Sequence, residues 1–267
     1  MQQRYIDFHA HIFPTNIAQK AVEQVGGYYN VRMEGDGSAE QLALSLQSSG
    51  GKLAIVHSSA TKPEQVESVN NFISDNVKKY PELIGYGTVH CEYPDIEGEI
   101  KRIAELGLRG IKLHADFQNF YIDDPSMYPI YEMAQGFLPI LFHVGDKNST
   151  KSSPKRLRKV MDMFPDMTVI AAHMGGYSAW DLAKEYLFGT RAYLDTSSTL
   201  MEMNVQEFKS LINSHDENRL LFGSDFPLQL PQSALTDFLS VGLTDTQYEK
   251  ILYKNASMLL GKGITND

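Results

Sequence analysis

The stretch Tyr5-Ile-Asp-Phe-His-Ala-His11 begins like an apolar strand and ends with two histidines. Successive side chains of a β-strand point to opposite faces, so His9 and His11 share one face. Their Cα atoms should lie about 6.5 Å apart, which lets both imidazoles bind one ion. Asp7 has the same parity and lies one step deeper, where it can support such a site. A His-x-His motif alone is weak evidence for metal binding, so a pair of surface histidines remains the alternative.

Short apolar runs alternate with longer helical stretches along the rest of the chain, which is typical of repeated βα units. We expect eight strands, at Tyr5–His9, Leu53–His57, Ile84–Val89, Leu108–His114, Pro139–His143, Thr168–His173, Ala192–Thr196 and Leu220–Ser224. Helices are expected over Thr61–Lys79, Ile96–Leu106, Ser153–Met163 and, closing the chain, Asp245–Leu260. A (β/α)₈ barrel has roughly 250 residues. The sequence therefore predicts one α/β domain, a TIM barrel spanning residues 1–267.

Two connections are longer than a plain turn. The segment Phe13–Ser49 follows the first strand, and we interpret it as an insertion over the barrel mouth. Its residues 26–29, Gly-Gly-Tyr-Tyr, would suit a flexible tip. The segment Phe117–Tyr128 is expected to be a long loop after the fourth strand.

Composition restricts the class of protein. The formal net charge is −9, which argues against a nucleic-acid-binding surface. No apolar run approaches the roughly 20 residues of a membrane helix. The single cysteine, Cys91, rules out an internal disulfide, and the N-terminus shows no signal-peptide pattern. We therefore expect a cytoplasmic protein that acts on a small molecule, with no nucleic-acid or membrane partner.

Three more predicted strands lead into residues that can bind metals. Apolar runs end at His143 and at His173, and Asp225 directly follows the last strand. Each residue alone is more typical of a satisfied core histidine or a turn aspartate. The carboxyl ends of barrel strands face the active-site mouth, however, so these side chains should gather there with His9 and His11. Imidazoles and a carboxylate are the ligands that ions such as zinc prefer.

These motifs together resemble a known family. They are His9-Ala-His11, Gly110-Ile-Lys-Leu-His114, His143, Ala172-His-Met-Gly-Gly176 and Phe222-Gly-Ser-Asp-Phe-Pro227. The set is similar to the amidohydrolase-related branch of the amidohydrolase superfamily. That branch includes aminocarboxymuconate-semialdehyde decarboxylase and the resorcylate decarboxylases. The resemblance covers almost the whole chain and implies a (β/α)₈ barrel with one catalytic divalent metal.

The resemblance also implies a role for each matching residue. It assigns His9, His11, His143 and Asp225 as metal ligands and His173 as the acid/base histidine. The carboxylate of Asp225 could also accept a proton, which makes it a second proton carrier. Zinc is the expected ion, and manganese or another divalent ion is the alternative. Two-metal relatives bridge their ions with a carboxylated lysine on the fourth strand, so a two-metal site through Lys112 stays open. A homodimer is also compatible with the resemblance.

Three further residues are predicted to line the substrate pocket. Lys112 and His114 share parity on the fourth strand, and a lysine there can bind a carboxylate or another anion. His57 ends the second strand. The alternative for Lys112 is a lysine that extends its ammonium toward solvent from the strand end.

Four functions fit these residues to different degrees. The first expectation is a metal-dependent hydrolase that attacks an amide or lactone with a metal-activated water, using His173 and Asp225 as proton carriers. The alternative is a non-oxidative decarboxylase of a small unsaturated or aromatic acid. A metal-dependent deoxyribonuclease is disfavoured because such enzymes place a glutamate on the fourth strand. A non-catalytic scaffold would not need the set of metal-binding residues.

Overall fold

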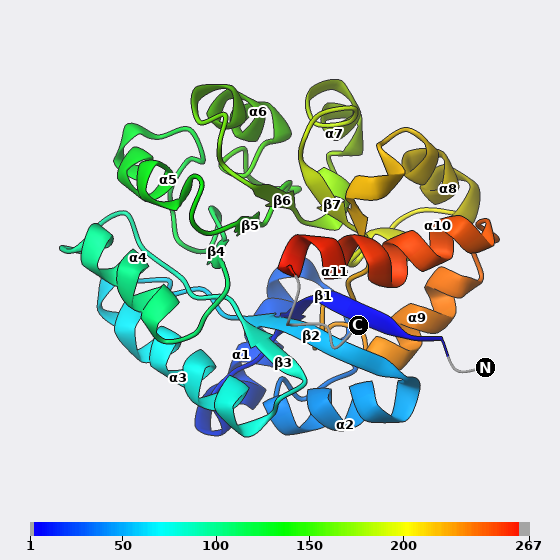
Figure 1. Cartoon of the computed structure of the whole chain (residues 1–267), viewed down its shortest axis with the longest axis horizontal. Helices are drawn as coiled ribbons and strands as arrows, with labels where there is room; N and C mark the ends of the chain where they lie inside the picture. Colours follow the sequence, from blue (N-terminus) through cyan, green and yellow to red (C-terminus); the bar gives the residue numbers. More distant parts are fainter. Residues whose placement is uncertain (1–2, 262–267) are drawn as a thin grey trace. The chain divides into compact units, whose positions relative to one another are not determined.

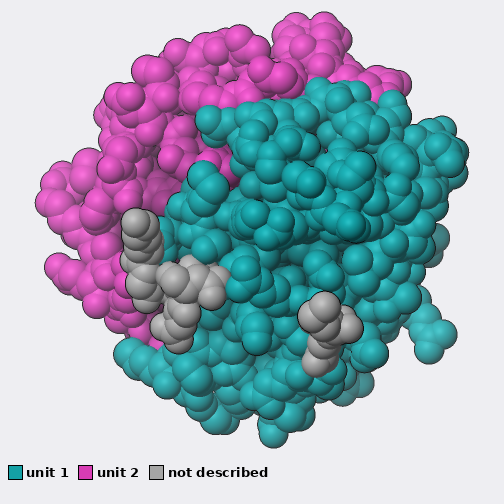
Figure 2. All heavy atoms as spheres, turned by 45° about the vertical axis from the view of Figure 1, so that its right-hand side comes forward, with its two compact units in different colours: residues 1–56, 76–84, 195–267 teal, residues 57–75, 85–194 magenta. Residues whose placement is uncertain are grey.

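The computed structural model describes residues 3–261 and divides into two compact units. Unit 1 comprises residues 1–56, 76–84 and 195–267, and unit 2 comprises residues 57–75 and 85–194. Figure 2 colours them teal and magenta. Each unit is described by itself.

All eight predicted strands are present, and six of them are shorter than the sequence indicates. They are β1 (Tyr5–His11), β2 (Gly51–His57), β3 (Leu83–Gly85), β4 (Ile111–Leu113), β5 (Ile140–Phe142), β6 (Val169–Ala171), β7 (Tyr193–Asp195) and β8 (Leu220–Leu221). The hydrogen-bonded order is β1-β2-β3 in one sheet and β4-β5-β6-β7-β8 in the other. Strand order therefore follows chain order, as expected of consecutive βα units.

Unit 1 pairs the last strand with the first. The backbone N–H of Phe8 donates to the Phe222 carbonyl at 2.7 Å, and a parallel bridge joins Ala10 to Phe226. On the other side of β8, the N–H of Thr196 donates to the Leu221 carbonyl at 2.9 Å. The ends of β7, β8 and β1 consequently lie next to one another.

Unit 2 holds a ladder of parallel strands. Ile111 pairs with Ile140 and Ile140 pairs with Val169, while Ala171 pairs with Leu194. An isolated parallel bridge between Gly87 and Ile111 extends the ladder toward β3. These strands are almost entirely buried, which explains their uninterrupted apolar sequences.

The helices follow the strands in alternation (Figure 1). Unit 1 contains α1 (Thr15–Tyr29), α2 (Ala39–Ser49), α8 (Val205–Asn213), α9 (Pro231–Leu239), α10 (Asp245–Glu249) and α11 (Asn255–Leu260). Unit 2 contains most of α3 (Val66–Lys79), with α4 (Ile96–Glu105), α5 (Tyr128–Ala134), α6 (Pro154–Met163) and α7 (Trp180–Tyr186). Among the described residues, no helix has the length and apolar character needed to cross a membrane.

Local sequence explains where several helices begin. The Ser38 hydroxyl accepts a hydrogen bond from the Gln41 N–H at the start of α2. Asn204 and Glu207 form a capping box at the start of α8. Such caps satisfy N–H groups that have no partner within the helix.

The segment after β1 differs from its predicted form. Residues 26–29 form the last turn of α1 instead of a flexible tip, and the helix ends only at Asn30, which adopts a left-handed conformation with φ of 55°. The two glycines do not end the helix, although their helix propensity is low. The second helix of the segment, α2, packs against α9 within unit 1. Its position over a barrel mouth stays a prediction.

The closing helix is also interrupted. A π-helical turn over Lys250–Lys254 separates α10 from α11. The carbonyl of Ile251, in this turn, accepts a hydrogen bond from the Phe222 N–H at 3.0 Å. The helix is thereby joined to the backbone that continues β8.

A glycine at the start of β4 allows close packing in unit 2. A Cβ atom at Gly110 would lie 2.4 Å from the ring of Tyr86, which is fully buried. We expect Gly110→Ala to lower the free energy of unfolding by about 1–3 kcal/mol, the usual cost of overpacking a core. Urea denaturation measures this change.

Gly27→Ala is the matched control. Its Cβ would meet no atom within 4 Å, and the residue lies in α1. We expect unchanged stability or a gain of up to about 1 kcal/mol, because alanine is the better helix former. Equal stability of the two variants would contradict the packing argument.

Candidate metal centre

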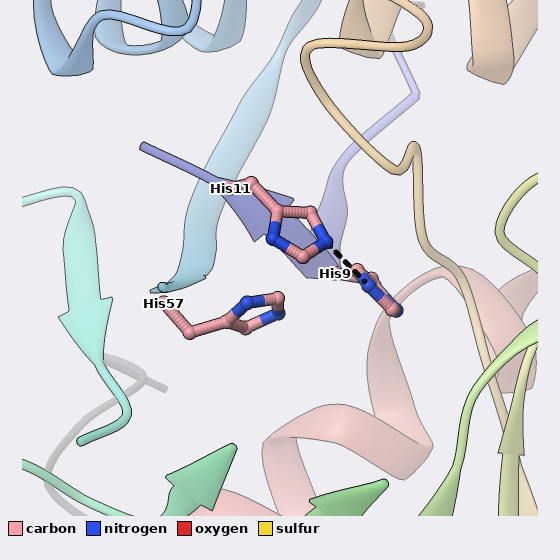
Figure 3. A group of neighbouring side chains, drawn as sticks. All are labelled: His9, His11 and His57. Atoms are coloured by element: carbon pink, nitrogen blue, oxygen red, sulfur yellow. Dashed lines mark hydrogen bonds between the residues drawn. The ribbon is translucent and has the colours of Figure 1, made fainter. Parts of the chain in front are cut away.

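Three of the predicted ligands meet in unit 1. The Nε2 atoms of His9 and His11 lie 3.2 Å apart (Figure 3), and each lies 3.4 Å from Oδ1 of Asp225. His9 is fully buried, whereas His11 and Asp225 keep 21% and 15% of their side chains exposed. The three atoms therefore form a nearly equilateral triangle that remains partly accessible to solvent.

This triangle fits a divalent ion. A tetrahedral ion with ligand bonds of about 2.0–2.1 Å separates its ligand atoms by about 3.3 Å. Two imidazole nitrogens and a carboxylate oxygen are also a typical donor set for zinc and similar ions. The donors in unit 1 thus match such an ion both in spacing and in chemistry.

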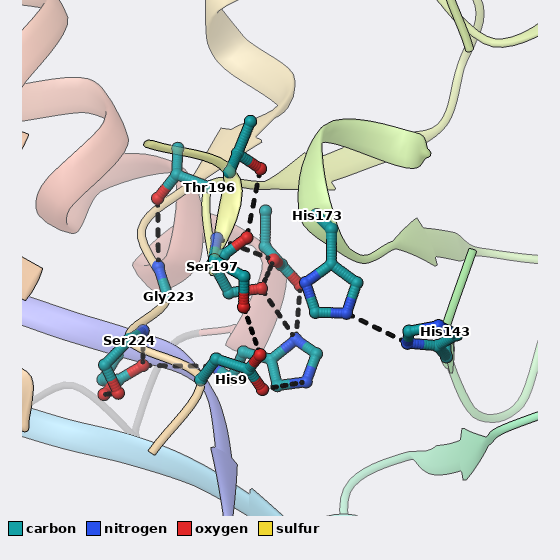
Figure 4. A network of polar contacts seen from close by, with 12 residues as sticks. His9, His143, His173, Thr196, Ser197, Gly223 and Ser224 are labelled. Atoms are coloured by element: carbon teal, nitrogen blue, oxygen red, sulfur yellow. Dashed lines mark hydrogen bonds and ion pairs between the residues drawn. The ribbon is translucent and has the colours of Figure 1, made fainter. Parts of the chain in front are cut away.

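Polar residues after β7 contact two of these side chains (Figure 4). Nδ1 of His9 lies 2.9 Å from Oδ2 of Asp195 and 3.2 Å from the Ser197 hydroxyl. The Ser198 hydroxyl donates to Oδ2 of Asp225. The contacts are therefore made by Nδ1 of His9 and Oδ2 of Asp225, the atoms that do not belong to the triangle.

Asp7 joins the ends of β1 and β8 as a buried carboxylate. It accepts hydrogen bonds from the Ser224 hydroxyl, from the Ser224 N–H at 2.9 Å and from the His9 N–H at 3.2 Å. Burial raises the pKa of Asp7 to about 7, although these hydrogen bonds oppose the rise. These three hydrogen bonds come from backbone N–H groups and a hydroxyl, so Asp7 orders the strand ends that carry the ligands.

A glycine permits the close approach of β8 to these groups. A Cβ atom at Gly223 would lie 2.9 Å from Cβ of His9 and 3.2 Å from Cβ of Ser197. Any larger residue would push against the backbone around His9. The Gly223 N–H also donates to the Thr196 hydroxyl at 3.3 Å (Figure 4).

Unit 2 contains a second group of histidines. Nδ1 of His143 lies 3.0 Å from Nε2 of His173 (Figure 4), while Nε2 of His143 lies 2.8 Å from the Gly145 carbonyl. A carbonyl only accepts hydrogen bonds, so Nε2 of His143 carries the hydrogen. Nδ1 is then the nitrogen of His143 that presents a lone pair, which is what a metal ligand requires.

His114 stacks on this group. Its ring is parallel to that of His143, with centroids 3.9 Å apart, and also stacks on Phe117 at 4.0 Å. Ligand-capable atoms of His114, Asp116 and His143 lie within 4.8 Å of one another. Burial raises the pKa of Asp116, against the effect of Ser149 and Ser152. Asp116 was not among the residues that the sequence pattern singled out.

The other residues predicted to bind substrate lie inside unit 2. Lys112 is fully buried on β4, and His57 is fully buried at the end of β2. Their role stays a prediction.

Each unit brings some of the predicted site residues together. His9, His11 and Asp225 come together in unit 1, and His143, His173 and His114 come together in unit 2. Sequence reasoning missed Asp195, Ser197 and Ser198. The signal was present, because β7 is an apolar run that ends in an aspartate, the same pattern that drew attention to His143 and Asp225.

Comparison with known proteins identifies the family. A family model described as amidohydrolase matches residues 6–262. Among curated proteins, a 2-amino-3-carboxymuconate-6-semialdehyde decarboxylase from Dictyostelium discoideum is 23% identical over 237 residues. That alignment covers 73% of this chain and 65% of the relative, slightly less than two-thirds of its length.

Solved structures with the same fold cover nearly the whole chain. An uncharacterized TIM-barrel protein from Bordetella bronchiseptica has a TM-score of 0.76 at 18% identity, covering 97% of this chain and 98% of the other. A dihydroxybenzoic acid decarboxylase from Polaromonas sp. JS666, solved with manganese and 2-nitroresorcinol, has a TM-score of 0.74 at 18% identity. It covers 97% of both chains. The chain is therefore a TIM-barrel enzyme that belongs to the amidohydrolase family.

Proposed function

We propose that this chain is a metal-dependent, non-oxidative decarboxylase of a small aromatic or unsaturated carboxylic acid. The converging atoms of His9, His11 and Asp225 are the observation that carries the metal dependence. The choice of reaction is supported by relatives that are named decarboxylases. The hydrolase that we expected first from the sequence has less support, from the name of the family and from a similar structure named a putative 2-pyrone-4,6-dicarboxylic acid hydrolase.

The residues present fit one divalent ion. His9, His11 and Asp225 would hold it through Nε2, Nε2 and Oδ1, and His143 is proposed as a further ligand through Nδ1. The structure of the Polaromonas relative contains manganese, so manganese is as good a candidate as the zinc that the ligand types suggest. When bound, the ion would supply positive charge that binds and polarises substrate oxygens.

The reaction requires one proton for each turnover. The bond between the substrate carbon and its carboxylate breaks, carbon dioxide leaves, and a proton replaces it on that carbon. Atoms and charge balance without an oxidant or a reductant. We assign the proton transfer to His173 and Asp225, because an imidazole and a carboxylate can each take up and release a proton.

The substrate-binding residues are proposed from their charge and burial. Lys112 offers a cationic group on β4 for the substrate carboxylate. The two faces of the His114 ring are covered by His143 and Phe117, so His114 is assigned to the pocket through the polar edge of its ring. His57 is assigned to the same pocket.

The metal ligands are tested by elemental analysis of purified variants. We expect about one divalent ion per chain in the unmodified protein. Loss of a residue that only hydrogen-bonds a metal ligand typically weakens metal binding about 10–100-fold. His9→Ala and Asp225→Ala remove a ligand itself and should weaken metal binding by more than that. His215→Ala is the control, because this histidine belongs to unit 1 but to no cluster of metal-capable side chains among the described residues, and its loss should leave the metal content unchanged. Equal metal content in all four proteins would refute the ligand assignment.

The reaction is tested with the metal-loaded protein and two substrate panels. One panel contains hydroxybenzoic acids, and the other contains lactones and amides. We expect carbon dioxide release from the first panel and incorporation of one solvent deuteron at the carbon that lost its carboxylate. Hydrolysis of a lactone or amide with uptake of ¹⁸O from water, and no carbon dioxide, would replace the decarboxylase proposal with the hydrolase.

His173→Ala separates proton transfer from metal binding. We expect the variant to keep its metal and to lose about 10²–10⁴-fold in rate, the usual contribution of a general acid or base. Loss of metal together with activity would instead make His173 a ligand. The measurement is the rate of carbon dioxide release beside the metal content of the same sample.

A further inference from the structure

A four-residue segment after β7 contacts the proposed metal ligands but contains none of them. We define the β7 turn as residues 195–198, Asp-Thr-Ser-Ser. Asp195 and Ser197 are fully buried, and Ser198 is 5% exposed. Burying a carboxylate costs desolvation free energy unless the carboxylate accepts hydrogen bonds. The hydrogen bonds of Asp195 indicate its role.

Asp195 fixes which nitrogen of His9 carries the hydrogen. Oδ2 of Asp195 lies 2.9 Å from Nδ1 of His9, and Oδ1 accepts hydrogen bonds from the N–H and the hydroxyl of Ser197. An ionised carboxylate only accepts, so the hydrogen of His9 lies on Nδ1. Nε2 then presents its lone pair toward His11 and Asp225.

Ser198 acts on the second ligand in the same way. Its hydroxyl donates to Oδ2 of Asp225, while Oδ1 of Asp225 faces the two histidines. Ser198 and Asp225 both have positive φ, 57° and 59°. Residues other than glycine rarely adopt this conformation, and it persists where the surroundings require it. Here it brings the hydroxyl and the carboxylate into contact.

We propose that the β7 turn positions two metal ligands: Asp195 holds the tautomer and ring orientation of His9, and Ser198 holds the Asp225 carboxylate so that one oxygen binds the ion. This inference rests on the proposed metal site. Asp195 and Ser198 are positioning residues, because each acts through a ligand. The β7 turn would thus fix the position of the ligand on β1 relative to the ligand that follows β8.

The turn also has a purely structural contact, which provides the control. The hydroxyl of Thr196 accepts a hydrogen bond from the Gly223 N–H at 3.3 Å, which is a backbone group and not a proposed ligand. Thr196→Val therefore perturbs the same turn without touching the hydrogen bonds to His9 or Asp225. If the turn is only structural, all substitutions in it should change metal affinity to a similar extent. If it positions the ligands, substitution of Asp195 or Ser198 should weaken metal binding more than Thr196→Val does.

The first experiment measures Mn²⁺ affinity by competition with a chelator. We expect Asp195→Asn and Ser198→Ala to bind Mn²⁺ about 10–100-fold more weakly than the unmodified protein. Ser198→Asn, which tolerates the positive φ and whose side-chain amide can donate to Asp225, should lose less affinity than Ser198→Ala. Thr196→Val should bind as tightly as the unmodified protein. Unchanged affinity in Asp195→Asn and Ser198→Ala would overturn the proposal, and so would an equal loss in Thr196→Val.

The second experiment reads the His9 tautomer by ¹⁵N NMR in metal-free protein, with His9→Gln for assignment. We expect the hydrogen on Nδ1 in the unmodified protein and, because an asparagine amide can donate, a shift toward Nε2 in Asp195→Asn. A hydrogen on Nε2 in the unmodified protein would overturn the role of Asp195, even if Asp195→Asn fails to fold. If the unmodified protein binds no Mn²⁺, the proposed metal function fails, and the tautomer still decides the role of Asp195.

Discussion

The backbone hydrogen bonds between β1 and the chain that follows β8 determine where the proposed ligands lie. The N–H groups of Phe8, His11 and Asp225 donate to the carbonyls of Phe222, Phe226 and His9 at 2.6–2.9 Å. A change of register by one residue would turn His9 and His11 to the opposite face of β1. Every contact of the triangle, from Asp7 to the β7 turn, depends on that register.

Burial of the polar groups around the triangle costs desolvation free energy, which the rest of the fold must offset. Asp7 and Asp195 are both fully buried carboxylates, and each accepts several hydrogen bonds. Such groups contribute little to stability compared with apolar residues of the same size. What they provide is a single orientation for the neighbouring groups, because a satisfied buried network has few alternative arrangements. Rigidity of this kind suits a site that must hold an ion in one geometry.

The sequence predicted the architecture better than the details of the site. Short apolar runs that alternate with helical stretches located all eight strands, because buried parallel strands are almost uninterrupted in their apolar sequence. Asp195 at the end of one such run was overlooked, since an isolated aspartate before a turn is also a common helix cap or turn residue. The helical form of residues 26–29 could not be predicted from propensity, because two successive glycines are poor helix formers. Hydrolysis and decarboxylation share the same proton carriers and metal ligands, so the residues alone do not separate them.

The π-helical turn near the end of the chain has a consequence for the order in which the molecule is assembled. The Phe222 N–H donates to the carbonyl of Ile251, so a residue just before Asp225 depends on a segment made much later during synthesis. Domains fold as their chain emerges from the ribosome. A nascent chain that stops short of Ile251 would leave this N–H without its acceptor and the backbone beside Gly223 less constrained. The geometry of the proposed metal site in unit 1 is therefore expected to mature only after Ile251 has been synthesised.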